Sequence, residues 1–191
     1  MKVIAGHYRG FNIPAPKGLR FRPTANRVRE AVFSAIDSHV EGKTVLDLFA
    51  GSGAFGFEAL SRNAKNVVFV DRSRVACANI KQVGERLGVH NKMLILNSTA
   101  LKAVKKLVAE NSKFSVIFLD PPYYSPSLDE ILEFRDFPYL FSDDSLIICE
   151  TSVRSQLPNP PPKAEIFFSR KYGETLVNIF SVVDKNYMTP L

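Results

Sequence analysis

The chain has 191 residues, of which 46% are hydrophobic and 23% charged, and its 25 Lys and Arg against 19 Asp and Glu give a net charge of +6. This length and composition suit one globular domain with a full hydrophobic core and argue against wholesale disorder. No apolar run approaches the roughly 18–20 residues of a membrane-spanning helix, and the first residues lack a signal-peptide pattern, so we expect a cytoplasmic protein with no membrane partner.

Basic residues concentrate near the N-terminus. Residues 1–30 contain seven Lys and Arg and only one acidic residue, Glu30, and this excess equals the net charge of the whole chain. A concentrated basic segment favours a polyanionic partner, because contacts to phosphates supply most of the non-specific affinity for nucleic acids. Groups that can stack on bases lie between the charges, at His7, Tyr8, Phe11 and Phe21. We therefore predict nucleic-acid contact, with a solvated basic face as the alternative.

The N-terminal part of the chain is expected to form a small extension and one helix. Residues 2–5 and 11–13 read as two short strands, which predicts a β-hairpin. Apolar residues between positions 28 and 36 recur at helical spacing, which predicts an amphipathic helix. Arg27 and Arg29 are expected to lie off its apolar stripe.

From residue 44 onward, apolar strands alternate with helical patterns. The predicted strands are 44–49, 66–70, 93–96, 114–119 and 146–149, and the predicted helices are 55–62, 74–87, 100–109 and 128–134. Continuous apolar strands between helices are typical of a parallel sheet covered on both faces. Two β-rich runs, 164–170 and 175–182, are expected to close that sheet as an antiparallel hairpin. The sequence thus predicts an α/β fold with a seven-stranded, mostly parallel sheet in a domain at 26–191, after a basic RNA-binding extension at 1–25.

The first of these strands ends in a glycine-rich loop. Gly51 and Gly53 allow a tight turn close to a ligand, and Asp71 ends the second strand, where its carboxylate would accept hydrogen bonds from both ribose hydroxyls. The GxGxxG spacing at 51–56 also fits an NAD site. Asp47 would repel a pyrophosphate, however, and suits the cationic amino group of a methionine moiety. The pattern favours S-adenosylmethionine, with S-adenosylhomocysteine as product. The expected binding residues are Asp47, Phe49, Gly51, Ser52, Gly53, Asp71, Arg72, Ser98 and Thr99.

The fourth strand of the alternation ends in the tetrapeptide Asp120-Pro121-Pro122-Tyr123. Ligands bind outside the carboxyl ends of parallel strands, so this motif should face the glycine loop. Two prolines stiffen the turn and leave carbonyl oxygens as acceptors. Asp120 and the Pro121 carbonyl would accept the hydrogens of an exocyclic amine, and Tyr123 would stack on the base. We therefore predict in-line methyl transfer to a base amine, helped by positioning and electrostatics.

These motifs, together with an N-terminal block, resemble one family over nearly the whole chain. The similar segments are Arg22-Pro23-Thr24, RVREAVF at 27–33, DLFAGSG at 47–53, EALSR at 58–62, DPPY at 120–123 and YGET at 172–175. They are similar to those of the bacterial 16S ribosomal RNA guanine-N2 methyltransferases. The resemblance implies a class I methyltransferase (Rossmann-like) fold, methyl transfer to N2 of one guanine in 16S rRNA, and the small ribosomal subunit as partner.

The resemblance also assigns the RNA contacts and leaves alternatives. The candidates for binding RNA are Arg9, Arg22, Arg27 and Arg29. The Arg guanidinium can form two parallel hydrogen bonds to a phosphate and can stack on bases. Thr99 stands where many relatives carry Asp, and its hydroxyl would accept a bond from the adenine amine of the methyl donor. The alternatives are an adenine-N6 methyltransferase acting on DNA or RNA and a non-catalytic RNA-binding protein with the same fold.

No metal is expected, because the three His residues are scattered in the sequence and the two Cys residues, Cys77 and Cys149, have no ligand spacing. We expect both thiols to lie in the core and the protein to be a monomer.

Overall fold

The fold is built on one seven-stranded sheet with the strand order β3-β2-β1-β4-β5-β7-β6. The computed structural model describes residues 1–15, 24–121, 127–155 and 158–182. The strands are β1 (Thr44–Asp47), β2 (Asn66–Asp71), β3 (Met93–Asn97), β4 (Phe114–Leu119), β5 (Phe141–Ser152), β6 (Ala164–Tyr172) and β7 (Thr175–Val182). The first five run parallel, whereas β7 pairs antiparallel with both β5 and β6. The predicted α/β sheet and its C-terminal hairpin are confirmed.

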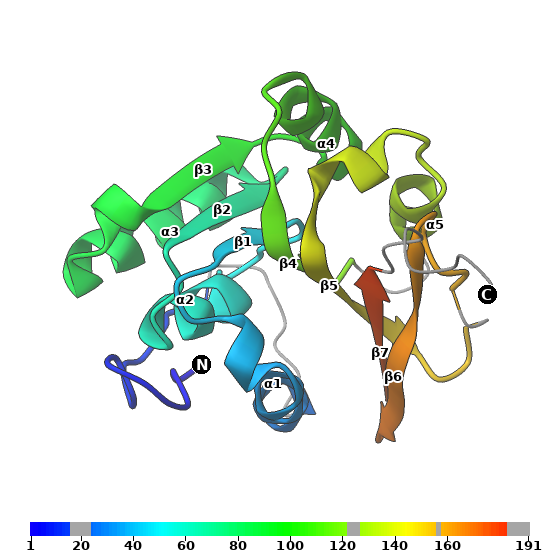
Figure 1. Ribbon diagram of the computed structural model, residues 1–191. Coiled ribbons are helices and arrows are strands. Elements are labelled where there is room, and N and C mark those ends of the chain that lie inside the picture. Colours follow the sequence, from blue (N-terminus) through cyan, green and yellow to red (C-terminus); the bar gives the residue numbers. More distant parts are fainter. Residues whose placement is uncertain (16–23, 122–126, 156–157, 183–191) are drawn as a thin grey trace.

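Helices cover both faces of this sheet (Figure 1). They are α1 (Thr24–Ala35), α2 (Ala54–Ser61), α3 (Arg74–Leu87), α4 (Ala100–Ala109) and α5 (Ser127–Leu132), with short 3-10 turns at Asp37–His39, His90–Lys92 and Phe137–Leu140. One core cluster lies between the sheet and α1, α2 and α3, and the other between the sheet and α4 and α5. Alternate residues of each strand supply the two clusters: Val45 and Phe118 belong to the first, and Leu46 and Leu119 to the second.

Strand β5 begins five residues earlier than its apolar run predicts. Its first half contains the polar residues 142–145, which interrupt the hydrophobic pattern. The register between β4 and β5 shifts there. The Ser145 hydroxyl donates to the carbonyl oxygen of Phe114 on β4 at 2.6 Å, and to that of Ser142 at 2.9 Å. Side-chain hydrogen bonds therefore extend the strand through a segment that hydrophobicity alone assigns to a loop.

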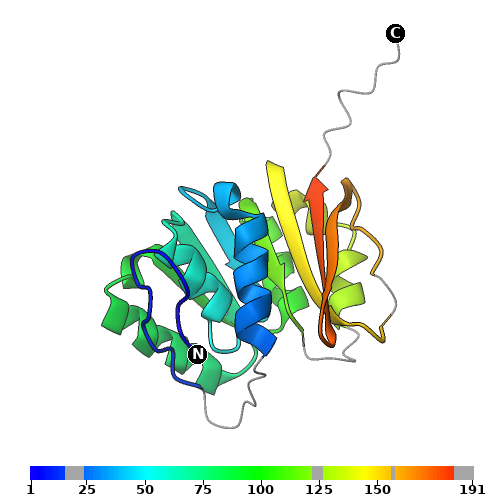
Figure 2. The same cartoon turned by 90° about the horizontal axis from the view of Figure 1, so that it is seen from below.

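The N-terminal segment, residues 1–13, does not form the two predicted strands. Its two arms meet in a single antiparallel bridge between Lys2 and Asn12. The arms exchange backbone hydrogen bonds near this bridge, from the Val3 amide to the Phe11 carbonyl oxygen at 3.0 Å, but the next amides, of Ile4 and Ala5, donate to the carboxylate of Glu58 on α2, at 2.7 and 3.0 Å. Figure 2 shows this segment beside α2 and α3, on the same side of the sheet as α1. The segment is thus attached to the main domain by bonds to α2 and not by strand pairing.

Candidate active site

Carboxylates lie at the carboxyl ends of four neighbouring parallel strands. Asp71 ends β2, Asp47 ends β1, Asp120 follows β4, and Glu150 lies on β5 next to Asp120, since Leu119 pairs with Cys149. By strand alternation, Asp47, Asp71 and Glu150 fall on the face covered by α1, α2 and α3, together with Val45, Phe69 and Ile148. The sheet therefore gathers acidic groups at its switch point, where ligands of such folds bind.

The loop after β1 is held in a conformation that only glycine adopts readily. Gly51 and Gly53 have φ values of +54° and +80°. A Cβ on Gly53 would also lie 2.8 Å from the Phe57 ring and 3.1 Å from Ile80. On Gly51, by contrast, the nearest atom to such a Cβ would be the Phe49 carbonyl oxygen at 3.9 Å. The backbone at Gly51 is thus open to an approaching group.

The third glycine of the motif has a packing role. A Cβ on Gly56, in the first turn of α2, would lie 2.1 Å from the Phe69 ring on β2. The absence of a side chain lets α2 pack closely on the sheet, and the Gly56 amide then donates to the Asp47 carboxylate at 3.1 Å. This contact ties the end of β1 to the start of α2 and so shapes the loop between them.

Asp47 is 3% exposed, and burial raises the pKa of its carboxyl to about 7. The negative charges of Asp120 and Asp71 contribute to the rise, and the hydrogen bond from the Gly56 amide opposes it. A buried carboxylate with two acidic neighbours is stabilised by a cation. The site is therefore electrostatically suited to a positively charged ligand.

The end of β2 is fixed by backbone contacts. The two carboxylate oxygens of Asp71 accept from the amide of Gly51 at 2.8 Å and from that of Ser73 at 2.7 Å. The Asp71 carbonyl oxygen accepts from the Ser98 amide at 3.1 Å and from the Asn97 side chain at 3.1 Å. These bonds bring together the glycine loop, the end of β2 and the turn after β3.

The remaining residues predicted for the methyl donor lie around this frame. Phe49 is partly buried, Ser52 is 4% exposed, and the Arg72 and Thr99 side chains are exposed. Thr99 is the N-cap residue of α4, and its side chain makes no capping hydrogen bond. The Thr99 hydroxyl is therefore not used by the helix end that it precedes.

The DPPY motif is described only in part. Asp120 is exposed, and Pro121 is buried. Asp120 lies close enough to Asp47 for its charge to raise the pKa of that carboxyl. The described part of the motif thus begins near Asp47 at the end of β1, whereas Pro122 and Tyr123 lie outside the described residues.

The structure separates the four arginines predicted to bind RNA. Arg9 and Arg27 are exposed, and Arg22 lies outside the described residues. Arg29 is only 1% exposed, so the RNA contact expected of it does not fit this structure. Its position on α1 is four residues before Phe33, which is fully buried, and not on the exposed face. Burial lowers the pKa of Arg29, whereas the carboxylates of Glu58 and Glu150 raise it.

One buried acid, Glu58, was not assigned a role from the sequence. Glu58 is fully buried in α2, where seven of eight residues are buried. A single acid in an otherwise apolar helix is a sequence signal for a buried cationic partner, because an unpaired buried charge is costly. Two arginines are such partners: the Nε of Arg62 lies 3.1 Å from Glu58 Oε1, and the Nε of Arg29 on α1 lies 3.8 Å from Glu58 Oε2.

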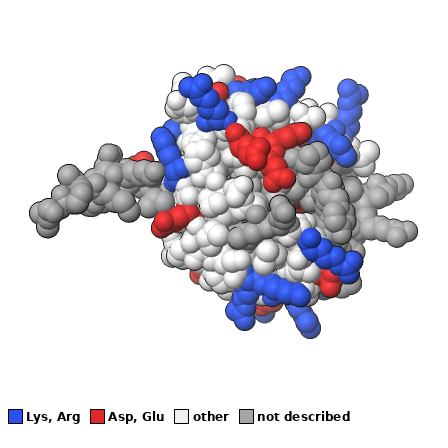
Figure 3. Space-filling view, turned by 90° about the vertical axis from the view of Figure 1, so that its right-hand side faces the viewer, with Lys and Arg blue, Asp and Glu red and all other residues white. Residues whose placement is uncertain are grey.

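The face of the molecule at the β6 end of the sheet has fewer features of an active site. Figure 3 shows the face at the β6 end of the sheet, where Lys and Arg lie mainly around the margin and a cluster of acidic side chains lies just above the centre. Ile166 and Phe167 of β6 are exposed. Within the described residues, no group of three or more His, Cys, Asp or Glu is arranged to hold a metal ion, and no helix is long and apolar enough to cross a membrane. Cys149 is buried, which raises its pKa, and Cys77 is partly buried.

The described residues fit S-adenosylmethionine. Its ammonium and sulfonium groups are cations, and the site presents the buried Asp47 carboxylate with Asp120 and Asp71 as neighbours. Its ribose carries two hydroxyl donors, for which Asp71 offers carboxylate oxygens at the end of β2. Open space beside Gly51 admits a ligand to the backbone.

Comparisons with known proteins agree with this arrangement. The family model described as "Conserved hypothetical protein 95" matches residues 1–181. The Bacillus subtilis protein YlbH is 33% identical over 180 residues, which are 94% of this chain and 98% of YlbH. Ribosomal RNA small subunit methyltransferase D of Escherichia coli is 28% identical over 94% of this chain and 89% of its own length. The solved structure of the E. coli protein yhhF superposes with a TM-score of 0.78 at 26% identity, and covers 95% of this chain and 97% of its own.

Proposed function

Because the chain belongs to the Conserved hypothetical protein 95 family of S-adenosylmethionine-dependent rRNA methyltransferases, we propose that it methylates the exocyclic N2 amine of one guanine in 16S rRNA of the small ribosomal subunit. The observation that carries this proposal is the placement of Asp120, at the end of β4, beside the buried Asp47 and the glycine loop after β1. It brings an acceptor for an amine next to a site for a cationic methyl donor. Similarity to methyltransferase D of E. coli supports the small-subunit substrate.

The methyl donor would be held by the ends of three strands. Asp47 would pair with its ammonium group, and the open backbone at Gly51, with Phe49, Ser52 and Gly53, would line its methionine end. Asp71 would accept from the ribose hydroxyls, and Arg72, Ser98 and Thr99 would border the adenosine. When bound, S-adenosylmethionine supplies an electrophilic methyl group on a sulfonium.

The DPPY motif would orient the acceptor. Asp120 is exposed at the end of β4, where its carboxylate can accept hydrogens from a guanine amine. Together with the Pro121 carbonyl it would fix the amine so that the nitrogen lone pair points to the methyl group, which is catalysis by positioning. Tyr123 would stack on a guanine that is unpaired or flipped out of its helix. The exposed Arg9 and Arg27, with Arg22, would contact RNA phosphates.

The test is nucleoside mass spectrometry on small ribosomal subunits purified from cells that lack this enzyme. Subunits and the matching free 16S rRNA are incubated with the full-length protein and S-adenosylmethionine, and Asp120→Ala protein serves as the control. We expect new N2-methylguanosine with the wild-type protein and none with the variant. N6-methyladenosine in place of N2-methylguanosine would instead support the adenine-N6 alternative, and no methylation of either RNA would refute the proposal.

A further inference from the structure

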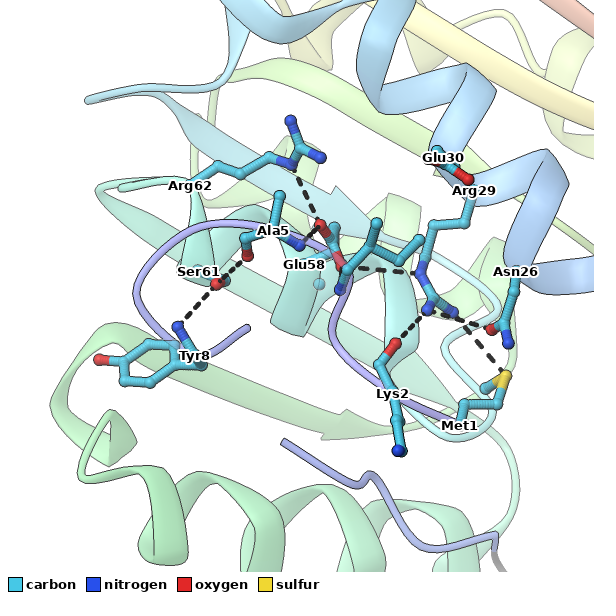
Figure 4. Close-up of polar contacts among 12 residues, drawn as sticks. Met1, Lys2, Ala5, Tyr8, Asn26, Arg29, Glu30, Glu58, Ser61 and Arg62 are labelled. Carbon is cyan, nitrogen blue, oxygen red and sulfur yellow. Dashed lines mark hydrogen bonds and ion pairs between the residues drawn. The ribbon is translucent and has the colours of Figure 1, made fainter. Parts of the chain in front are cut away.

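The carboxylate of Glu58 binds two separate parts of the chain at once. Its two oxygens accept from the amides of Ile4 and Ala5, and Oε1 also accepts from Arg62 Nε at 3.1 Å. Oε2 lies 3.8 Å from Arg29 Nε on α1 (Figure 4). Glu58 is fully buried, so these contacts replace its hydration completely. A carboxylate so enclosed holds its partners in one geometry.

A second set of contacts, one helical turn further along α2, fixes the same segment. The Ser61 hydroxyl donates to the Ala5 carbonyl oxygen and accepts from the Tyr8 amide at 2.9 Å. The Ser61 carbonyl oxygen accepts from the His7 amide at 2.8 Å. Gly6, which lies between Ala5 and His7, has a φ of +79°, and a Cβ on it would lie 1.9 Å from the Ser61 carbonyl oxygen. Residues 4–8 therefore pack closely against the C-terminal half of α2 and are hydrogen-bonded to it.

Arg29 extends this arrangement to α1. Its Nη2 donates to the Lys2 carbonyl oxygen at 2.5 Å and to the Asn26 side chain at 3.3 Å. The Arg29 guanidinium thus lies between the N-terminal segment, its own helix and Glu58 (Figure 4). The exposed Arg9 belongs to the segment, and the exposed Arg27 belongs to α1. Both proposed RNA contacts are consequently attached to the same buried ion pair.

We propose that Glu58 is a positioning residue for the RNA substrate: its buried carboxylate fixes residues 1–13 and α1 in a constant relation to each other before RNA binds. This inference rests on the proposed function. A preordered surface binds more tightly, because the conformational cost of ordering it has been met during folding. If only a fraction of molecules holds the segment in place, the apparent dissociation constant for RNA rises by the reciprocal of that fraction.

The experiment compares Glu58→Gln and Ser61→Ala with wild-type protein in steady-state methylation of small ribosomal subunits. Glu58→Gln keeps the side-chain volume but removes the charge opposite Arg29, and Ser61→Ala loosens residues 5–8 without creating an unpaired buried charge. We expect RNA KM to rise about tenfold in Glu58→Gln and about threefold to tenfold in Ser61→Ala. The kcat and the affinity for S-adenosylhomocysteine should stay within about twofold, because α2 contacts the methyl-donor site through Gly56 at its other end.

Ser169→Ala is the matched control, since its hydroxyl donates to Asn178 on the β6–β7 hairpin, away from the N-terminal segment. Its RNA KM should not change. Hydrogen exchange should show faster exchange of the amides at residues 4–8 in Glu58→Gln and in Ser61→Ala, but not in Ser169→Ala. If Glu58→Gln does not fold, the RNA KM and hydrogen exchange of Ser61→Ala test the inference on their own.

Three results would contradict the inference. An unchanged RNA KM in folded variants would overturn it while leaving the proposed function intact. A fall in kcat and in S-adenosylhomocysteine affinity, in proportion to the change in KM, would show that Glu58 only stabilises the domain. Failure of the wild-type protein to methylate RNA would refute the proposed function and, with it, this inference.

Discussion

Replacing Asp47 by Asn should stabilise the free protein while weakening its binding of the methyl donor. Burial raises the pKa of Asp47 from its ordinary value of 3.8 to about 7. The folded protein therefore holds this proton more tightly than the unfolded chain, and its stability declines as the pH rises from 3.8 to about 7. Above pH 7 the difference corresponds to about 4 kcal/mol, and at pH 5 to about 2 kcal/mol. Asn keeps an acceptor for the Gly56 amide without this cost.

The assay is thermal unfolding of the unliganded protein at pH 5 and pH 8. Asp47→Asn should raise Tm by about 10 °C at pH 8 and by about half of that at pH 5, given about 2–4 °C per kcal/mol for a domain of this size. Asp144→Asn is the matched control with the opposite sign. The hydrogen bond from Lys43, at 2.6 Å, lowers the pKa of Asp144, so its removal should slightly destabilise the protein at pH 8.

Ligand affinity provides the second half of this prediction. The ionised Asp47 carboxylate should attract the donor's ammonium group, so wild-type affinity for S-adenosylmethionine should rise as the pH increases from 6 to 8. The variant should bind more weakly and lose that part of the pH dependence. An Asp47→Asn protein that unfolds at the wild-type temperature at pH 8, or binds S-adenosylmethionine as tightly as wild type, would refute the reasoning.

Four further substitutions separate the contributions of the site and of the N-terminal helix. Gly53→Ala forces a Cβ into the left-handed region and towards Phe57, so denaturant unfolding should show a loss of about 2 kcal/mol or more, with weaker S-adenosylmethionine binding by calorimetry. Asp120→Ala, at an exposed position, should abolish methyl transfer while calorimetric binding of S-adenosylmethionine stays nearly intact; full activity would contradict the role given to this carboxylate. Arg29→Ala removes one of the two cationic side chains beside the buried Glu58 and leaves Arg62 as the other, so it should cost about 3 kcal/mol of stability in urea titrations. Arg27→Ala, on the exposed face of the same helix, should instead leave stability within about 0.5 kcal/mol and weaken RNA binding in a salt-dependent way.

The main-domain elements were predictable where local signals agree with the tertiary structure. The helix predicted at 74–87 matches α3, because Ser73 caps its first turn and its apolar stripe faces the sheet. Strand β4 matches its prediction because all six residues are buried. The first half of β5 escaped prediction, since Ser145 reaches the Phe114 carbonyl oxygen only once the sheet has formed.

The site was predictable to the extent that topology fixes it. Parallel strands end at one edge, so Asp47, Asp71 and Asp120 had to approach each other once the strand order was known. The buried role of Arg29 escaped prediction because basic residues are normally placed on the exposed face of a helix. Its environment depends on Glu58, which is 29 residues later in the sequence, and on the carbonyl oxygen of Lys2. Pairings of this kind have no periodicity that a sequence pattern would reveal.

Helix α2 connects the two halves of the proposed chemistry. Its first turn holds the methyl-donor loop through the Gly56 amide and Asp47, and its last turn holds the N-terminal segment through Glu58 and Ser61. Eight residues of α-helix span only about 12 Å, so one short, buried element sets the spacing between the donor site and the N-terminal segment. The close packing of Gly56 on Phe69 prevents this helix from sliding on the sheet. A buried Glu58 at its far end is therefore consistent with a role in transmitting that fixed position to the RNA-binding residues.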